Sequence, residues 1–108
     1  MRRANVYCQG VLAGILSKDQ ASYRFQYEPE YLTNLKGPPI SLSFPKREAH
    51  FESPVLFPFF FGLLAEGDDK VLQCRVLKID EEDHFTRLLK TCQAETIGGV
   101  TVKEAVSA

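Results

Sequence analysis

The sequence predicts an α+β domain, in which helices pack on a small and mostly antiparallel sheet. The first observation is that short segments with alternating apolar and polar residues, the pattern of a half-buried strand, fill the first part of the chain. The second is that segments with helical spacing follow, before one closing strand. A chain of 108 residues has the size of one domain, so residues 1–108 are expected to fold as a single unit.

The first 27 residues are expected to form three antiparallel strands, over residues 5–8, 11–16 and 23–27. The third strand alternates aromatic and polar side chains, which is typical of a strand with one buried face. Gly14, inside the second strand, marks a bulge or a close approach of two backbones. A proline and acidic residues near its start predict a short helix over residues 28–32.

The middle of the chain is expected to add one strand and one helix. Residues 40–44 alternate again and predict a fourth strand, and residues 46–53 are expected to form an irregular polar connection. Ser53 is suited to the N-cap and Pro54 to the first helical position. Together they predict a helix from residue 54 to about residue 65.

Two more helices and a last strand are expected in the remaining residues. Asp68 or Asp69 is expected to cap a helix whose apolar face is formed by Val71, Leu72, Val76 and Ile79. Asp80 with Asp83 resembles a capping box and predicts the start of the next helix. The apolar stripe of that helix is formed by Phe85, Leu88, Leu89 and Cys92. A glycine pair then leads into a strand over residues 100–102.

The totals exclude several classes of protein. A net charge of −1, from 13 basic and 14 acidic residues, argues against direct nucleic-acid binding. No segment approaches the roughly 20 apolar residues of a membrane span, and the N-terminus lacks the apolar run of a signal peptide. A cytoplasmic location without membrane contact is therefore expected. Cys8, Cys74 and Cys92 have no CxxC spacing and are expected to be buried apolar side chains rather than redox groups.

The sequence also lacks the patterns that usually carry catalysis. His50 lies in a polar connection, and His84 is expected to be a solvated residue early in a helix. The acids at residues 80–83 suit a helix N-terminus better than a metal site. There is no phosphate-binding glycine loop, kinase catalytic loop or zinc-ligand spacing. We therefore expect no enzymatic activity, no metal and no cofactor.

Four of the eight phenylalanines fall within residues 57–61. Successive helical residues point about 100° apart, so these rings cannot all face one side of a helix. Any one of them is best explained as a core residue. The whole run, however, indicates that at least one ring is presented to a partner.

Five motifs follow one another in a specific order. They are YRFQYEPEYL at residues 23–32, PISLSFP at 39–45, FFFGLLAEG at 59–67, FTRLL at 85–89 and IGGVTV at 97–102. Together they resemble the N-terminal subdomain of HipA-type serine/threonine kinases over about residues 5–103. Two residues depart from that pattern, because Gly62 stands where asparagine is common and Ala65 where proline is common.

The resemblance is to a free-standing form of this subdomain, similar to the HipS-like antitoxins of HipBST toxin–antitoxin systems. In those systems the small protein restrains a HipT kinase, and HipB is the DNA-binding companion. The resemblance thus implies an antitoxin that binds a HipT-like kinase and reaches DNA only through a HipB-like partner. Two other functions stay open at this point, a non-inhibitory module that links the kinase to the HipB-like partner and a small enzyme.

The kinase contact is expected within residues 59–67. The residues assigned to it are Phe59, Phe61, Gly62, Leu64 and Glu66. Phe59 and Phe60 match aromatic positions of the family motif, so they are expected to be core rings. Phe61 occupies a slot where the resembling kinases vary and often carry polar residues, so it is expected to face outward.

Overall fold

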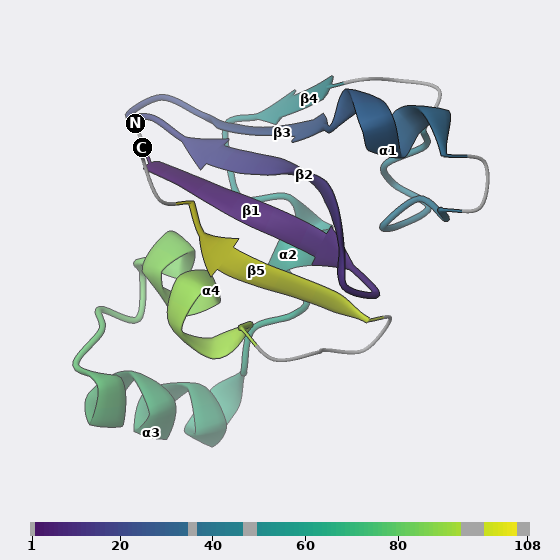
Figure 1. Cartoon of the computed structure of the whole chain (residues 1–108). Coiled ribbons are helices and arrows are strands. Elements are labelled where there is room, and N and C mark those ends of the chain that lie inside the picture. Colours follow the sequence, from purple (N-terminus) through teal and green to yellow (C-terminus); the bar gives the residue numbers. More distant parts are fainter. Residues whose placement is uncertain (1, 35–36, 47–49, 94–98, 106–108) are drawn as a thin grey trace.

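The computed structural model describes residues 2–34, 37–46, 50–93 and 99–105. Within these residues an antiparallel sheet has the strand order β4-β3-β2-β1-β5 (Figure 1). The strands are β1 (Arg2–Cys8), β2 (Val11–Lys18), β3 (Tyr23–Tyr27), β4 (His50–Ser53) and β5 (Val100–Glu104). The helices are α1 (Pro29–Thr33), α2 (Pro58–Phe61), α3 (Gly67–Leu77) and α4 (His84–Thr91). The α+β fold predicted from the sequence is therefore confirmed.

The three predicted N-terminal strands and the short helix α1 are present. Alternate side chains such as Val6 in β1 and Phe25 in β3 are fully buried, which places one face of the sheet in the core. Gly14 is a close-approach site, as predicted, because a Cβ atom there would lie 2.4 Å from the carbonyl oxygen of Gln26. A side chain at this position would push β2 away from β3.

The predicted last strand is also confirmed, and it lies beside the first (Figure 1). In β5, Val102 is opposite Val6 of β1, and both side chains are fully buried. Of the glycine pair that precedes the strand, Gly98 lies outside the described residues. Gly99 has a φ of 75°, and its carbonyl oxygen accepts a 2.8 Å hydrogen bond from the Gln9 N–H.

The strand predicted over residues 40–44 is wrong. In a strand Leu42 would share a face with Ile40 and Phe44, yet Leu42 is 97% exposed while the other two are buried. The segment is instead a turn held by Tyr27, at the end of β3. The Tyr27 hydroxyl accepts a hydrogen bond from the Ile40 N–H (3.1 Å) and donates one to the Phe44 carbonyl (2.5 Å). These bonds fix both ends of the turn against a buried ring.

The fourth strand is β4, which lies in the connection that we expected to be irregular. It pairs with β3 at the edge of the sheet, with Phe51 opposite Phe25. Its sequence looks like a polar loop because His50 and Glu52 point to solvent. An edge strand of four residues carries too few apolar side chains to be recognised by alternation alone.

The helix predicted from residue 54 to about residue 65 is also wrong, because helical structure begins only at Pro58. Proline has no N–H to donate to the carbonyl four residues earlier, which favours a helix that starts at this residue. Phe57 is the N-cap and has an extended ψ of 137°. The extended stretch before α2 lets Leu56 and Phe57 both reach the core, at 6% and 8% exposure.

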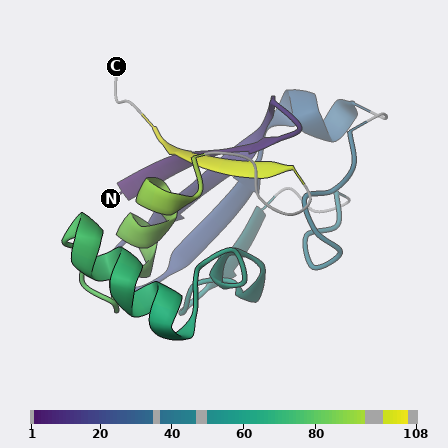
Figure 2. The same ribbon diagram turned by 90° about the horizontal axis from the view of Figure 1, so that it is seen from below.

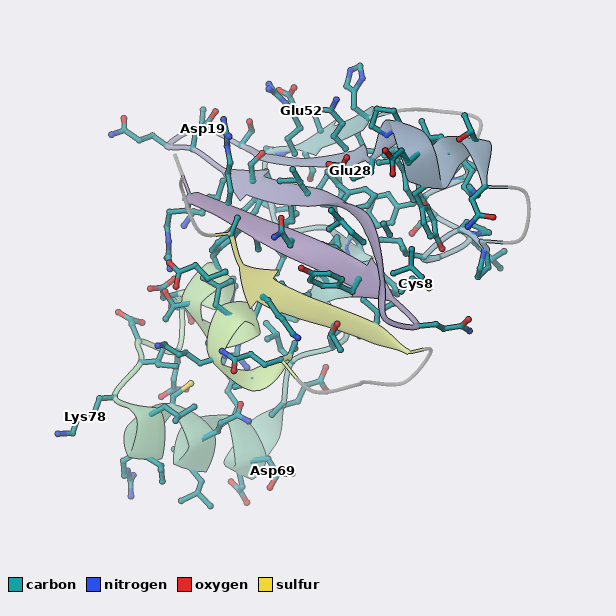
Figure 3. All side chains as sticks on the ribbon, in the orientation of Figure 1. Cys8, Asp19, Glu28, Glu52, Asp69 and Lys78 are labelled. Atoms are coloured by element: carbon teal, nitrogen blue, oxygen red, sulfur yellow. The ribbon has the colours of Figure 1, made fainter. Side chains whose placement is uncertain are left out.

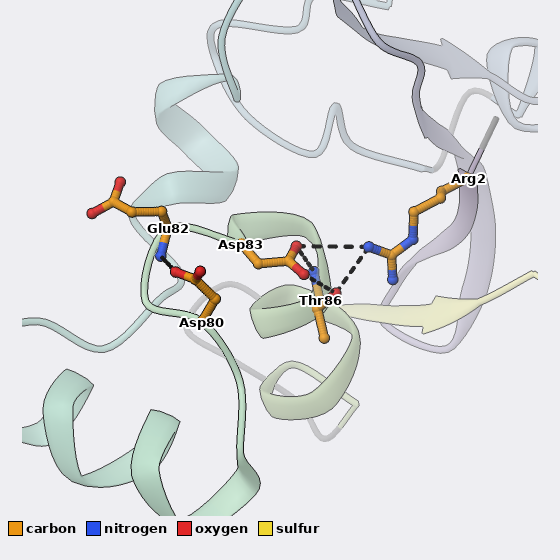
Figure 4. Close-up of polar contacts among 5 residues, drawn as sticks. All are labelled: Arg2, Asp80, Glu82, Asp83 and Thr86. Carbon is orange, nitrogen blue, oxygen red and sulfur yellow. Dashed lines mark hydrogen bonds and ion pairs between the residues drawn. The ribbon is translucent and has the colours of Figure 1, made fainter.

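Helices α2, α3 and α4 lie on one side of the sheet (Figure 2). The predicted stripe of α4 is confirmed. Its side chains are exposed by 4% or less and comprise Phe85, Leu88, Leu89 and Cys92. The predicted capping box is wrong, since Asp83 itself is the N-cap and accepts hydrogen bonds from the backbone N–H and the hydroxyl of Thr86 (3.2 and 2.7 Å). The Asp80 carboxylate accepts the Glu82 N–H, and its backbone carbonyl accepts the Asp83 N–H. Arg2 approaches both Asp83 and Thr86 (Figure 4).

Helix α3 is present, but its predicted aspartate cap is wrong. It begins at Gly67, and its N-cap is Glu66. Leu72 and Val76, two residues of the predicted apolar face, are 59% and 68% exposed and point to solvent. The helix lies at the margin of the molecule, with Asp69 and Lys78 near its two ends (Figure 3).

The prediction that the three cysteines are buried is confirmed. Each is a free thiol and each is buried, with exposures of 4%, 4% and 1% for Cys8, Cys74 and Cys92. Burial raises the pKa of the Cys92 thiol, which favours its neutral form.

Candidate protein-interaction surface

The phenylalanine run divides between the core and the surface. Phe60 is fully buried, with ring centroids 5.8 Å from those of both Phe25 and Phe44. Phe57 is buried and Phe59 partly buried against the same cluster. Phe61 is 40% exposed. The prediction that Phe60 is core and Phe61 faces outward is therefore confirmed, and so is the expectation that rings on one helical turn must diverge.

The exposed ring of Phe61 rests on helix α4. Its centroid lies 5.2 Å from that of His84 in an edge-to-face arrangement, with an interplanar angle of 79°. This arrangement is favourable for aromatic pairs because ring edges are positive and ring faces negative. His84 is the first residue of α4, so the orientation of Phe61 depends on where that helix begins.

A buried arginine ties the backbone after α2 to the same helix. The Nη2 atom of Arg87 donates a 2.7 Å hydrogen bond to the carbonyl oxygen of Ala65, and Nη1 lies 3.4 Å from Nδ1 of His84. Arg87 is only 1% exposed, and among the described residues its Nε has no hydrogen-bond partner. A buried cation is costly unless it is hydrogen-bonded. The bond to Ala65 therefore strongly fixes the path of residues 62–66.

The turn itself is held by successive short-range hydrogen bonds. The Gly62 N–H donates to the Pro58 carbonyl (2.9 Å), and the Leu64 N–H donates to the Phe61 carbonyl (3.1 Å). Gly62 has a φ of −66°, and a Cβ there would make only ordinary contacts, the nearest at 3.4 Å from the Pro58 carbonyl oxygen. The asparagine that is common at this position in the resembling kinases therefore fits without a change of backbone.

The residues assigned to the contact do not all reach the surface. Phe61, Gly62 and Glu66 are exposed, and Phe59 is partly buried. Leu64 is a correction, because it is 5% exposed and packs in the core, where a partner does not reach it. Sequence spacing alone did not reveal this, since the turn after Gly62 directs Leu64 inward.

Two residues that shape this surface were not predicted. His84 was expected to be solvated, but its side chain is only 21% exposed. Burial, and then the positive charge of Arg87, lower the pKa of His84 below its usual value. Arg87 carried no signal in the sequence, because an arginine beside an apolar helical stripe is normally exposed.

The described residues include no group of three or more histidine, cysteine or acidic side chains placed to hold a metal ion. His50 is exposed in β4, on a different element from His84. Within the same residues, no helix combines the length and apolarity that a membrane crossing requires. The features that stand out are thus an exposed aromatic ring and the network that orients it.

Comparison with known proteins identifies the domain. The model of the HipA N-terminal domain family matches residues 4–103. This chain belongs to that family. A solved structure of the N-terminal domain of HipA toxin superimposes with a TM-score of 0.73 at 30% identity, covering 100% of this chain and 96% of that one.

Two relatives differ in how much of their length this domain occupies. An uncharacterized protein of Haemophilus influenzae is 36% identical, and the match covers 96% of this chain and 93% of the relative. Y4mE of Sinorhizobium fredii, which is named as a kinase, is 29% identical over 82% of this chain. The match spans only 21% of Y4mE. The same domain is therefore nearly the whole of one relative and about a fifth of the other.

Proposed function

We propose that this chain is an antitoxin that binds and neutralises a HipT-like serine/threonine kinase, in a HipBST-type system with a HipB-like DNA-binding partner. The observation that carries the proposal is the Phe61 ring, which is 40% exposed on a backbone tied to α4 by Arg87. An aromatic side chain that is already ordered loses little freedom on binding, and aromatic residues are favoured anchors at the centre of interfaces.

The two relatives support an interaction with a kinase in trans. In Y4mE the matched segment is a small part of a protein named as a kinase, whereas in the Haemophilus protein it is nearly the entire chain. A domain that is covalently joined to a kinase in one relative has a ready surface for binding a separate kinase in another. The antitoxin role extends this argument from binding to inhibition.

The proposed contact comprises the exposed residues of the turn after α2. Phe61 provides the anchor, Gly62 the close backbone surface and Glu66 an exposed carboxylate at the start of α3, with Phe59 at the margin. Leu64 supports the turn from the core side. The complementary kinase surface would offer an apolar pocket with a cation beside it.

Growth of cells that express the kinase tests the proposal directly. Phe61→Ala is expected to fold normally but to lose protection, because it removes an exposed ring without opening a core cavity. Leu42→Ala is the matched control, since Leu42 is 97% exposed and lies outside the proposed contact. Phe60→Ala is expected to lose stability by about 3–5 kcal/mol as a core truncation.

A phosphotransfer assay separates inhibition from passive assembly. If the chain binds the kinase without slowing phosphotransfer, it is an assembly module and the antitoxin proposal is wrong. Full protection by Phe61→Ala would contradict the assigned anchor. The chain alone is expected to bind neither Mg-ATP nor operator DNA, since it carries no phosphate-binding motif and a net charge of −1.

A further inference from the structure

Exposed large apolar side chains are concentrated in one short part of the chain. Among the described residues, eight such side chains are exposed, and five of them lie between residues 61 and 77. These five are Phe61, Val71, Leu72, Val76 and Leu77. Single exposed apolar residues are normal on a soluble protein, but a cluster of this kind marks an interaction surface.

Helix α3 directs these residues in a defined way. Cys74 is 4% exposed and faces the rest of the protein. Leu72 and Val76 are four residues apart, so they lie one above the other on a single face of the helix. At about 100° per residue, that face is turned by roughly 160–200° from Cys74. Leu72 and Val76 therefore form the solvent-facing side of α3, at 59% and 68% exposure.

Charged residues flank this outer face of α3. Asp68 and Asp69 are in the first turn, and Arg75 is in the last. All three are exposed. The paired acids beside the apolar residues disfavour an anionic membrane surface, which attracts basic amphipathic helices. The pattern fits a protein groove with an apolar floor, a cation near the start of the helix and an anion near its end.

The chain leads from the turn that carries Phe61 straight into α3. The helix begins at Gly67.

We propose that the outer face of α3, centred on Leu72 and Val76, is a second part of the surface that binds the HipT-like kinase. This inference rests on the function proposed above and enlarges its interface from one turn to a turn and a helix. It also accounts for an apolar pattern in α3 that the isolated domain does not bury. In the complex Leu72 and Val76 would act as the i and i+4 anchors of a helix in a groove.

Calorimetric titration of the HipT-like kinase from the same organism with matched variants tests this inference. The double variant Leu72→Gln, Val76→Gln keeps helix-compatible residues and is expected to retain the melting temperature of the parent chain. Its affinity for the kinase is expected to fall by about 10-fold or more. The control is the double variant Val11→Gln, Leu42→Gln, which changes two exposed apolar residues (49% and 97%) on other segments. Its affinity for the kinase is expected to stay within about 2-fold of the parent value.

The outcomes separate this inference from the function on which it rests. If the α3 variant binds as tightly as the parent while Phe61→Ala binds weakly, the helix is outside the interface and the kinase proposal stands. If the parent chain does not bind the kinase, both proposals fail. If the parent sediments as a dimer that the α3 variant converts to a monomer without loss of kinase affinity, a second copy covers the helix and the inference is wrong. If the double variant has a lower melting temperature than the parent chain, Leu72→Ala is used in its place, and its affinity for the kinase is also expected to fall.

Discussion

Helices α3 and α4 are consecutive in the chain and lie on the same side of the sheet, yet they use their apolar residues in opposite ways. In α4 the apolar stripe is buried, with Phe85 at 0% and Leu88 at 1% exposure. In α3 the largest apolar side chains, including Leu72 at 59%, are exposed and only Cys74 is buried. The difference teaches that an apolar pattern at helical spacing is buried by the domain itself in one helix and left exposed in the other.

The ends of the two helices also differ, because α4 is fixed by a side-chain cap and α3 is not. The first turn of α4 is fixed by the Asp83 side chain, whereas α3 has no side-chain cap at Glu66. The last turn of α3 ends at Lys78 in the left-handed region, with a φ of 58°, which costs a non-glycine residue some free energy. Helix α4 is thus built for stability. Helix α3 has no side-chain cap at its start and ends in a conformation that costs a lysine free energy.

The largest expected effect comes from truncating one residue in each helix. Phe85→Ala is expected to lower the free energy of unfolding by about 3–5 kcal/mol, because it leaves a cavity beneath the sheet. Leu72→Ala is the matched change in α3. Its free energy of unfolding is expected to stay within about 0.5 kcal/mol of the parent value. Urea denaturation measures both. Equal losses for the two variants would mean that α3 is also part of the core, and the contrast drawn between the two helices would be wrong.

The contrast between the two helices also explains what sequence reasoning achieved. The stripe of α4 and the strands β1 to β3 were predicted correctly because their periodic patterns match real burial. The same method found an apolar face at Leu72 and Val76, but a periodic pattern reports apolar spacing and does not say whether those side chains are buried in the domain. The turn held by Tyr27 and the inward direction of Leu64 depend on contacts between distant residues.

The candidate surface was predicted only in part. Phe61 was correctly placed outside and Phe60 inside, since rings on one helical turn must diverge. The network of Arg87 and His84 was missed, because its partner is a backbone carbonyl, that of Ala65, 22 residues away. No residue pattern identifies such a bond. The start of α2 was misplaced because Ser53 and Pro54 carry the features of a helix start, which Pro58 carries as well.

A smaller effect is expected at the caps. Asp83→Ala removes the side chain that accepts two hydrogen bonds from Thr86, and is expected to cost about 1 kcal/mol, as is usual for a lost N-cap. Glu66→Ala, at the equivalent position of α3, is expected to change the free energy of unfolding by only a small fraction of that loss, because no cap hydrogen bond is removed. Thermal melting of the two variants provides the measurement. A larger loss for Glu66→Ala would reverse the assignment of α4 as the better-anchored helix.

The smallest expected effect concerns pH and His84, the α4 residue against which the Phe61 ring packs. Burial, and then the charge of Arg87, lower the pKa of His84, so the unfolded chain binds a proton before the folded one as the pH falls. The stabilising effect of neutral His84 is therefore complete above the usual histidine pKa of about 6.5 and declines as the pH falls toward the lower folded-state value.

Unfolding measured between about pH 7.5 and pH 5 should show this loss in the parent chain, and His84→Gln should reduce the slope. Asp83 does not interfere with this measurement. Its pKa is also lowered, so its contribution to stability is lost only at more acidic pH. The same slope in the parent and His84→Gln would show that His84 is not held neutral against Arg87. The link from α4 through His84 to the Phe61 ring would then be looser than the 5.2 Å ring contact indicates.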